Sequence, residues 1–172
     1  AETCVNSVSL DELFALTGEN KQAFLDAFCA RRLTYGDIVG KPELREGICD
    51  LFRTLNPNEV VTTHGAAGAN HLAMYALIRP GDHVISVLPT YQQLYAIPQS
   101  FGAQVDLLPL REENGFLPDL DELRGLIKPN TRLICLNNPN NPTGALMTRP
   151  MLEAVVAMAR EVGAYVLCDE VY

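Results

Sequence analysis

Thr131 to Gly144 reads TRLICLNNPNNPTG, a short apolar run that passes directly into a loop of asparagines and prolines. The run has the length and composition of a buried strand. The loop, Asn137–Gly144, contains four asparagines, two prolines and one glycine, which favours a rigid, tightly turned segment and excludes a helix. In open α/β sheets ligands bind beyond the carboxyl ends of the strands, so this loop is a candidate binding segment.

The chain from residue 60 onward repeats this design, because short apolar runs alternate with helical patterns. The alternation predicts an α/β fold with three layers, αβα, around a mostly parallel central sheet. Asp119 and Glu122 are spaced as a capping box, and Thr148 can cap a helix that has Pro150 in its first turn. We expect strands at 60–63, 83–87, 105–110, 131–136 and 164–168, and helices at 67–78, 90–100, from 119 and from 148 to 162.

The first 45 residues read as a separate helical segment. Ser9 and Glu12 form a capping-box pattern ahead of an apolar helical run, and a second helix is expected at about 20–31. Pro42 suits the first turn of a third helix. At the other end the chain stops just beyond the last expected strand. A domain rarely ends there, so we expect that the sequence is truncated.

The composition limits the possible partners. A net charge of −8, with 13 basic residues that form no run, argues against nucleic acid and membrane surfaces. No apolar stretch approaches the roughly 18 uncharged residues of a membrane-spanning helix, and no secretory leader is visible, which predicts a cytoplasmic protein without a membrane partner. An anionic ligand must then be held locally, by backbone N–H groups or single side chains. These features indicate a small-molecule ligand.

The cysteines and histidines do not predict a metal site. The five cysteines are odd in number and contain no CxxC pair, so we expect reduced thiols, with Cys135 and Cys168 in apolar strands. His64, His71 and His83 lack metal-binding spacing.

Four segments are expected at the carboxyl ends of the strands: Gly65–Ala69, Pro89–Tyr91, Asn137–Gly144 and Asp169. In the first, small residues at a helix N-terminus can bind phosphate through the amides of Ala66 and Ala67, although a plain turn has the same composition. Tyr91 can stack on a flat heteroaromatic ring or pack in the core.

Asp169 ends a buried strand, where a carboxylate needs a positive partner to offset desolvation. A protonated ring nitrogen would serve, because a pyridinium beside a carboxylate stays charged and can accept electrons from a substrate carbanion. The alternative is an aspartate that caps the next helix.

The order of these segments resembles the class I/II aminotransferases, which are fold-type-I pyridoxal 5'-phosphate (PLP) enzymes. The resemblance implies an N-terminal helical segment at 1–45 and part of a PLP-binding large domain at 46–172. It also implies transfer of an amino group between an amino acid and a 2-oxo acid, in amino-acid metabolism and biosynthesis. The matching motifs are YGDIVGKPELR (35–45), GAA (65–67), RPGD (79–82), PTY (89–91), NPTG (141–144) and DEVY (169–172).

Residue roles follow from the resemblance by position. Asp169 would pair with the pyridine nitrogen of PLP, Asn141 and Tyr172 would bond its phenolic oxygen, and Tyr91 would stack on the ring. The backbone amides of the pair Ala66–Ala67 would bind the phosphate, where many relatives have a hydroxyl.

The resemblance also implies a homodimer, because Tyr35 in such enzymes reaches the phosphate of the other subunit.

The catalytic lysine of the family, which binds PLP covalently, follows the DEVY-like strand and is not in this sequence. Lys21, Lys41 and Lys128 all precede Asp169 and fit no such position. The given chain alone is therefore expected to be inactive, and the intact protein active. Two alternatives stay open: another PLP-dependent enzyme, such as a C–S lyase, decarboxylase or cyclase, and a non-catalytic fragment that serves as an interaction module.

Overall fold

A computed structural model describes residues 6–172, so Cys4 lies outside the described residues. The chain forms two compact units, which divide between Thr62 and Thr63.

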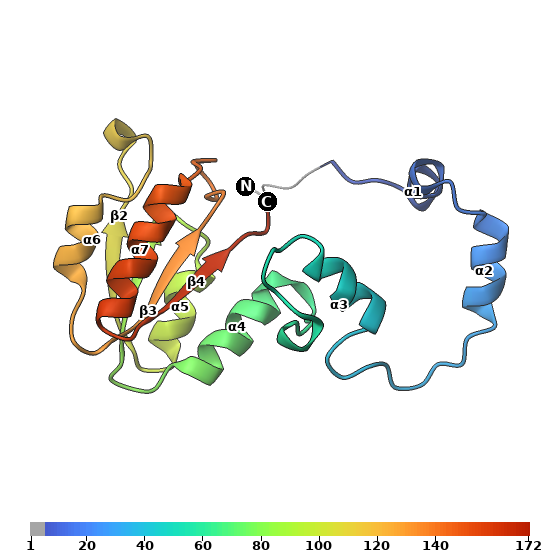
Figure 1. The fold of residues 1–172 in the computed structure, drawn as a ribbon, viewed down its shortest axis with the longest axis horizontal. Helices are drawn as coiled ribbons and strands as arrows, with labels where there is room; N and C mark the ends of the chain where they lie inside the picture. The colour runs from blue at the N-terminus through green and yellow to red at the C-terminus, as the bar shows by residue number, and fades with distance from the viewer. Residues whose placement is uncertain (1–5) are drawn as a thin grey trace. The chain divides into compact units, whose positions relative to one another are not determined.

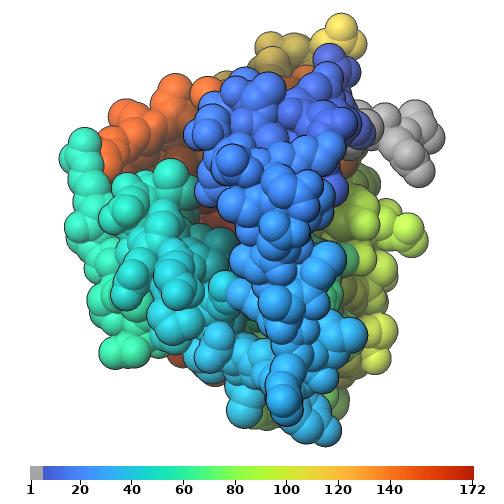
Figure 2. All heavy atoms as spheres, turned by 90° about the vertical axis from the view of Figure 1, so that its right-hand side faces the viewer, coloured from blue at the N-terminus to red at the C-terminus, as the bar shows by residue number. Residues whose placement is uncertain are grey.

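The N-terminal unit is helical. Its elements are α1 (Leu10–Thr17), α2 (Lys21–Cys29), α3 (Pro42–Cys49) and a short 3-10 helix η1 (Pro57–Glu59). The expected capping box at Ser9 and Glu12 is present, and Asn20 caps α2 by accepting from the Ala23 N–H at 2.9 Å. None of the residues in α1, α2 or α3 is fully buried. Figure 2 shows the atoms of α1 and α2 in blue, with many of them at the surface.

The predicted strand at 60–63 is wrong. In the structure these residues have no strand neighbour, and the Thr62 N–H donates a single bond to the Val39 carbonyl at 3.0 Å. The segments around residues 40 and 62 can approach closely because position 40 is glycine, with φ +106°. A Cβ at Gly40 would overlap the Thr62 side chain. A β-branched run without a pairing partner stays a single extended segment.

The C-terminal unit is the expected α/β fold, with a central sheet of four parallel strands in the order β2-β1-β3-β4. The other strand predictions are confirmed to within two residues at each end. The elements are α4 (Gly65–Leu77), β1 (His83–Leu88), α5 (Gln93–Ser100), β2 (Gln104–Pro109), η2 (Glu112–Asn114), α6 (Leu120–Leu126), β3 (Thr131–Asn137), α7 (Arg149–Glu161) and β4 (Tyr165–Asp169).

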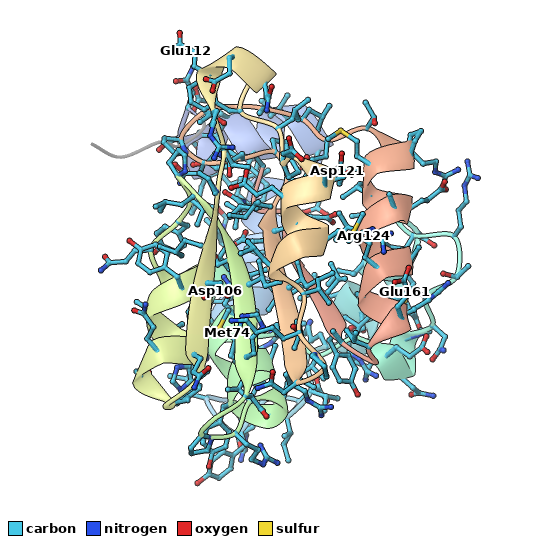
Figure 3. The ribbon with its side chains drawn as sticks, turned by 90° about the vertical axis from the view of Figure 1, so that its left-hand side faces the viewer. Met74, Asp106, Glu112, Asp121, Arg124 and Glu161 are labelled. Atoms are coloured by element: carbon cyan, nitrogen blue, oxygen red, sulfur yellow. The ribbon has the colours of Figure 1, made fainter. Side chains whose placement is uncertain are left out.

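Helices cover both faces of the sheet, as Figure 1 shows. Alternate residues of a strand point to opposite faces, so Ile85 of β1 packs in one core with Leu123 of α6 and Val155 of α7. Its neighbour Val84 packs in the other core with Met74 of α4, which is labelled in Figure 3. The three-layer αβα prediction is confirmed.

Two helix starts lack a side-chain bond that the sequence pattern predicts. Asp119 caps α6 through the N–H groups of Asp121 and Glu122, but the Glu122 side chain turns to Arg111 at 2.6 Å and forms no capping box. Thr148 begins α7 without a side-chain cap bond. An ion pair offers a carboxylate a stronger partner than a neutral N–H group, so the nearby arginine decides the first case.

Candidate functional site

The carboxyl edge of the sheet brings together the four segments singled out in the sequence. Asn137 and Asp169 are paired on the last rung between β3 and β4. Hydrogen bonds then join Asp169 to α4, β3 to the Asn/Pro loop, and that loop to Pro89 after β1. The residues at this edge are therefore joined in one connected polar network, and their role in binding stays a prediction.

Asp169 is the centre of this network, and its side chain is only 6% exposed. One carboxylate oxygen, Oδ2, accepts a hydrogen bond from the Asn70 amide at 2.8 Å. The other, Oδ1, accepts a longer bond from the Val171 N–H at 3.3 Å. Within residues 6–172 both partners are neutral donors and no salt bridge reaches this carboxylate. A buried carboxylate without a cation is costly unless a ligand supplies the charge.

The side chain of Asn137 links β4 to the Asn/Pro loop by two hydrogen bonds. It is 2% exposed, and its amide donates to the main-chain carbonyl of Asp169 at 2.9 Å. Its side-chain oxygen accepts the Asn141 N–H at 2.6 Å. One asparagine therefore fixes the positions of the two residues expected to face the ring of the cofactor, Asp169 and Asn141.

Asn140 joins the same loop to the end of β1. Its amide donates to the Pro89 carbonyl at 3.2 Å and to the Thr143 hydroxyl at 2.9 Å. Its side-chain oxygen, the Thr90 hydroxyl and the Gln93 side-chain oxygen are buried and make no hydrogen bond within the described residues. Buried polar atoms are nearly always paired in folded proteins, so these three oxygens can each still take a hydrogen-bond partner.

The N-terminus of α4 presents backbone donors beside this network. The helix begins at Gly65, which has φ +76°, and His64 provides no side-chain cap. The amides of Ala66 and Ala67 therefore lie in a first turn where N–H groups lack intrahelical acceptors. Ala66 and Asn70 are one helical turn apart, about 6 Å along the axis, so these donors lie near the Asp169 carboxylate.

The remaining predicted site residues are exposed aromatic side chains. Tyr91 follows β1 and is 42% exposed, and Tyr172 follows Asp169 and is 44% exposed. Tyr35 belongs to the N-terminal unit, where its side chain is fully exposed. Their roles stay predictions.

The thiols do not take part in this network. Burial raises the pKa of Cys135, and burial, assisted by Glu170 and Asp169, raises the pKa of Cys168 to about 12. Both remain protonated at neutral pH and behave as core residues. Among residues 6–172 no group of three or more metal-ligating side chains is present.

Sequence reasoning did not identify Asn70, Asn137 or Asn140 as individual site residues. Asn70 offered one signal, since it is a polar residue one turn before Met74 on an otherwise Ala- and Leu-rich helix. The other two are indistinguishable in sequence from neighbouring asparagines, because only the fold decides which of them turn inward.

This combination of an αβα sheet, an Asn/Pro loop and a terminal buried aspartate matches one family over nearly the whole chain. The family described as aminotransferase class I and II matches residues 4–172. The chain belongs to this family.

Individual relatives agree with this assignment. A PLP-dependent aminotransferase from Streptococcus suis has a solved structure with a TM-score of 0.94 and 54% identity, covering 96% of this chain and 44% of that one. The arginine–pyruvate transaminase of Pseudomonas aeruginosa is 35% identical over 156 residues, which is 88% of this chain and 40% of that protein. Capreomycidine synthase of Streptomyces vinaceus is 43% identical over 110 residues, 64% of this chain and 28% of that protein. The chain thus spans well under half the length of the relatives it matches.

PLP is the cofactor that this family membership implies, and the residues present fit it. The uncompensated buried carboxylate of Asp169 suits a protonated ring nitrogen, and the open amides at the start of α4 suit a phosphate. The Asp169 carboxylate and the amides at the start of α4 thus both lie at the carboxyl edge of the sheet, where ligands of α/β folds bind.

Proposed function

We propose that the intact protein is a PLP-dependent aminotransferase, which transfers an amino group between an amino acid and a 2-oxo acid. The observation that carries this proposal is the buried carboxylate of Asp169, whose described partners are all neutral donors. When bound, PLP would act as an electron sink for the substrate's α-carbon. The chain's own residues hold and orient it.

The ring would be held by residues from three elements. Asp169 would keep the ring nitrogen protonated, because a carboxylate in a low-dielectric site strongly favours a neighbouring cation. Asn141 and Tyr172 would donate hydrogen bonds to the phenolic oxygen, and Tyr91 would stack on the ring. Asn137 holds the main chain of both Asp169 and Asn141, so it sets the spacing between their contacts.

The phosphate would be bound by the Ala66 and Ala67 amides at the positive end of the α4 dipole. The partner subunit would add its own copy of Tyr35, in a cytoplasmic homodimer engaged in amino-acid biosynthesis. Residues 46–172 would form part of the large domain. The rest of that domain, including the catalytic lysine, and a C-terminal small domain would come from sequence outside this chain.

A second candidate is another PLP-dependent reaction of an amino acid on the same fold, such as elimination, decarboxylation or cyclisation. It is favoured by the likeness to capreomycidine synthase, which is named as a synthase. The electron sink is common to these reactions, and they differ in substrate placement.

The experiment uses the full-length protein, PLP and a panel of amino acids with a 2-oxo acid acceptor. We expect visible absorbance from bound PLP, a borohydride-labelled lysine that follows Tyr172 in the full sequence, and a new amino acid formed from the acceptor. Consumption of the amino acid without amino transfer would select the second candidate. Absence of both PLP absorbance and labelling would contradict both.

A further inference from the structure

We propose that Asn70 is a positioning residue for Asp169, whose carboxylate it holds in the orientation that faces the cofactor ring nitrogen. This inference rests on the proposed function, because it deepens the role of Asp169. Its basis is the buried bond from the Asn70 amide to Asp169 Oδ2, 2.8 Å long, between residues 99 positions apart in the chain.

Asn70 is a polar residue at a buried position of α4, which is unfavourable unless its side chain forms hydrogen bonds. Asn70 and Met74 are four residues apart, so they lie on the same helix face, and both are buried. Met74 packs against Val84 and Leu133 in the core. A leucine at position 70 would extend that apolar face, whereas asparagine adds a polar group that must find a partner. The partner that it has is the carboxylate of Asp169.

The chemistry of an amide sets what this contact does. The Nδ2 group of asparagine can only donate, so Asn70 gives the carboxylate a hydrogen bond without adding a charge. The bond also fixes rotation of the carboxylate, because the second contact, from the Val171 N–H to Oδ1, is longer at 3.3 Å and comes from the chain just beyond β4. Asn70 therefore supplies the well-formed hydrogen bond to this carboxylate from a regular element.

Position along α4 links this contact to the phosphate donors. Ala66 is one turn before Asn70 on the same helix. A single rigid element would therefore position both ends of the cofactor. The first-turn amides would contact the phosphate, and Asn70 would hold the Asp169 carboxylate that pairs with the ring nitrogen. Such shared support keeps the distance between the two contacts constant.

The test measures the protonation of the ring nitrogen of bound ¹⁵N-labelled PLP by NMR, as a function of pH, in the full-length protein. Asn70→Leu replaces the amide with methyl groups on the same branched skeleton, and Asn70→Ser removes the amide donor while keeping a shorter polar side chain. Asn70→Gln retains the amide. Asn130→Leu is the matched control, since Asn130 is exposed and precedes β3 at the opposite edge.

We expect both donor-removing variants to lose the ring proton at lower pH than wild type. Their kcat should fall by about ten- to a hundredfold at little change in KM, the loss typical of one hydrogen bond to a charged group. Asn70→Gln should recover part of both effects, and Asn130→Leu should match wild type. A residue that acts only in packing would lower the melting temperature without moving the ring titration.

The variant Asp169→Asn distinguishes a failure of the proposed role of Asn70 from a failure of the proposed pairing of Asp169 with the ring. If Asp169→Asn abolishes the ring proton while Asn70→Leu and Asn70→Ser titrate like wild type, the role of Asn70 is wrong and the proposed function stands. If Asp169→Asn leaves the ring titration unchanged, the pairing of Asp169 with the ring is wrong, and the role of Asn70 fails with it.

Discussion

Two carboxylates at opposite edges of the sheet, one partly exposed and one buried, have different partners. At the amino edge Asp106 of β2, labelled in Figure 3, accepts from Lys128 at 2.6 Å and from the His83 ring at 3.0 Å. At the carboxyl edge Asp169 has only neutral donors among the described residues. Lys128 neutralises the carboxylate of Asp106, whereas no cationic side chain among residues 6–172 forms a salt bridge with Asp169.

The amino-edge cluster is also internally complete. The Thr131 hydroxyl accepts the Lys128 N–H at 2.8 Å, so its own proton can be donated to His83 Nδ1, also at 2.8 Å. His83, which is fully buried, then donates from Nε2 to Asp106. Every side chain of this cluster has a partner, whereas three buried oxygens at the carboxyl edge make no hydrogen bond within residues 6–172. The difference separates an edge whose polar groups are paired within the protein from the edge at which we propose that the cofactor binds.

The largest expected effect tests the carboxyl edge. Asp169→Asn should lower kcat/KM by about 10²–10³-fold, the cost of removing one preorganised electrostatic contact. The unfolding free energy of the cofactor-free protein should change little, because the asparagine oxygen can still accept from Asn70 and removal of a buried charge offsets the lost bond from the Val171 N–H. Steady-state kinetics and urea unfolding measure the two quantities. Unchanged kinetics would remove the contrast between the edges.

The next effect tests the amino edge. His83→Leu leaves Thr131 and Asp106 each short of a partner, and should cost about 1–3 kcal/mol in unfolding free energy. The kcat of the folded fraction should match wild type, because the change lies at the edge away from the proposed site. Urea unfolding and active-site titration check both points. A fall in kcat at constant stability would contradict the division of roles.

The pH dependence of stability sharpens the comparison further. The hydrogen bond from Lys128, with help from His83, lowers the pKa of Asp106 below its ordinary value of 3.8 despite some desolvation. A lowered folded pKa means that the stabilisation is complete above about 3.8 and is lost as pH falls through the folded value.

Lys128→Met should therefore destabilise the protein by about 0.2–1 kcal/mol at pH 7, since the pair is partly exposed. The difference in unfolding free energy between the variant and wild type should become smaller as pH falls below 3.8. Urea unfolding at a series of pH values measures it. A gap that widens towards low pH would show that Asp106 is not the group responsible.

The smallest effect concerns a pair that belongs to neither edge. Arg124 of α6 and Glu161 of α7 point toward one another in Figure 3 and are 3.1 Å apart, but both side chains are more than half exposed. Arg124→Ala should change stability by no more than about 1 kcal/mol, less at high salt, without affecting activity. Thermal unfolding at two salt concentrations provides the check. A larger loss would mean that charge pairs far from the edges also stabilise the sheet.

Much of the fold could be predicted because its signals are local. The apolar runs of β1 to β4 and the caps at Ser9, Asn20 and Asp119 depend on residues within a few positions. The predicted strand at 60–63 failed because strand formation needs a neighbour, and no local pattern reveals whether one is there. Glu122 failed as a capping residue for a similar reason, since Arg111 lies eleven residues away.

The sequence by itself determined the family, the αβα class and the presence of an aspartate and an asparagine at the ends of parallel strands. Only the tertiary structure decided that Asn137 fastens Asp169 to Asn141, and that Asn70 reaches the same carboxylate across 99 residues. The reason is physical: periodicity and capping are set within a turn or a strand, whereas a buried hydrogen bond between distant residues depends on how the crossover helices pack.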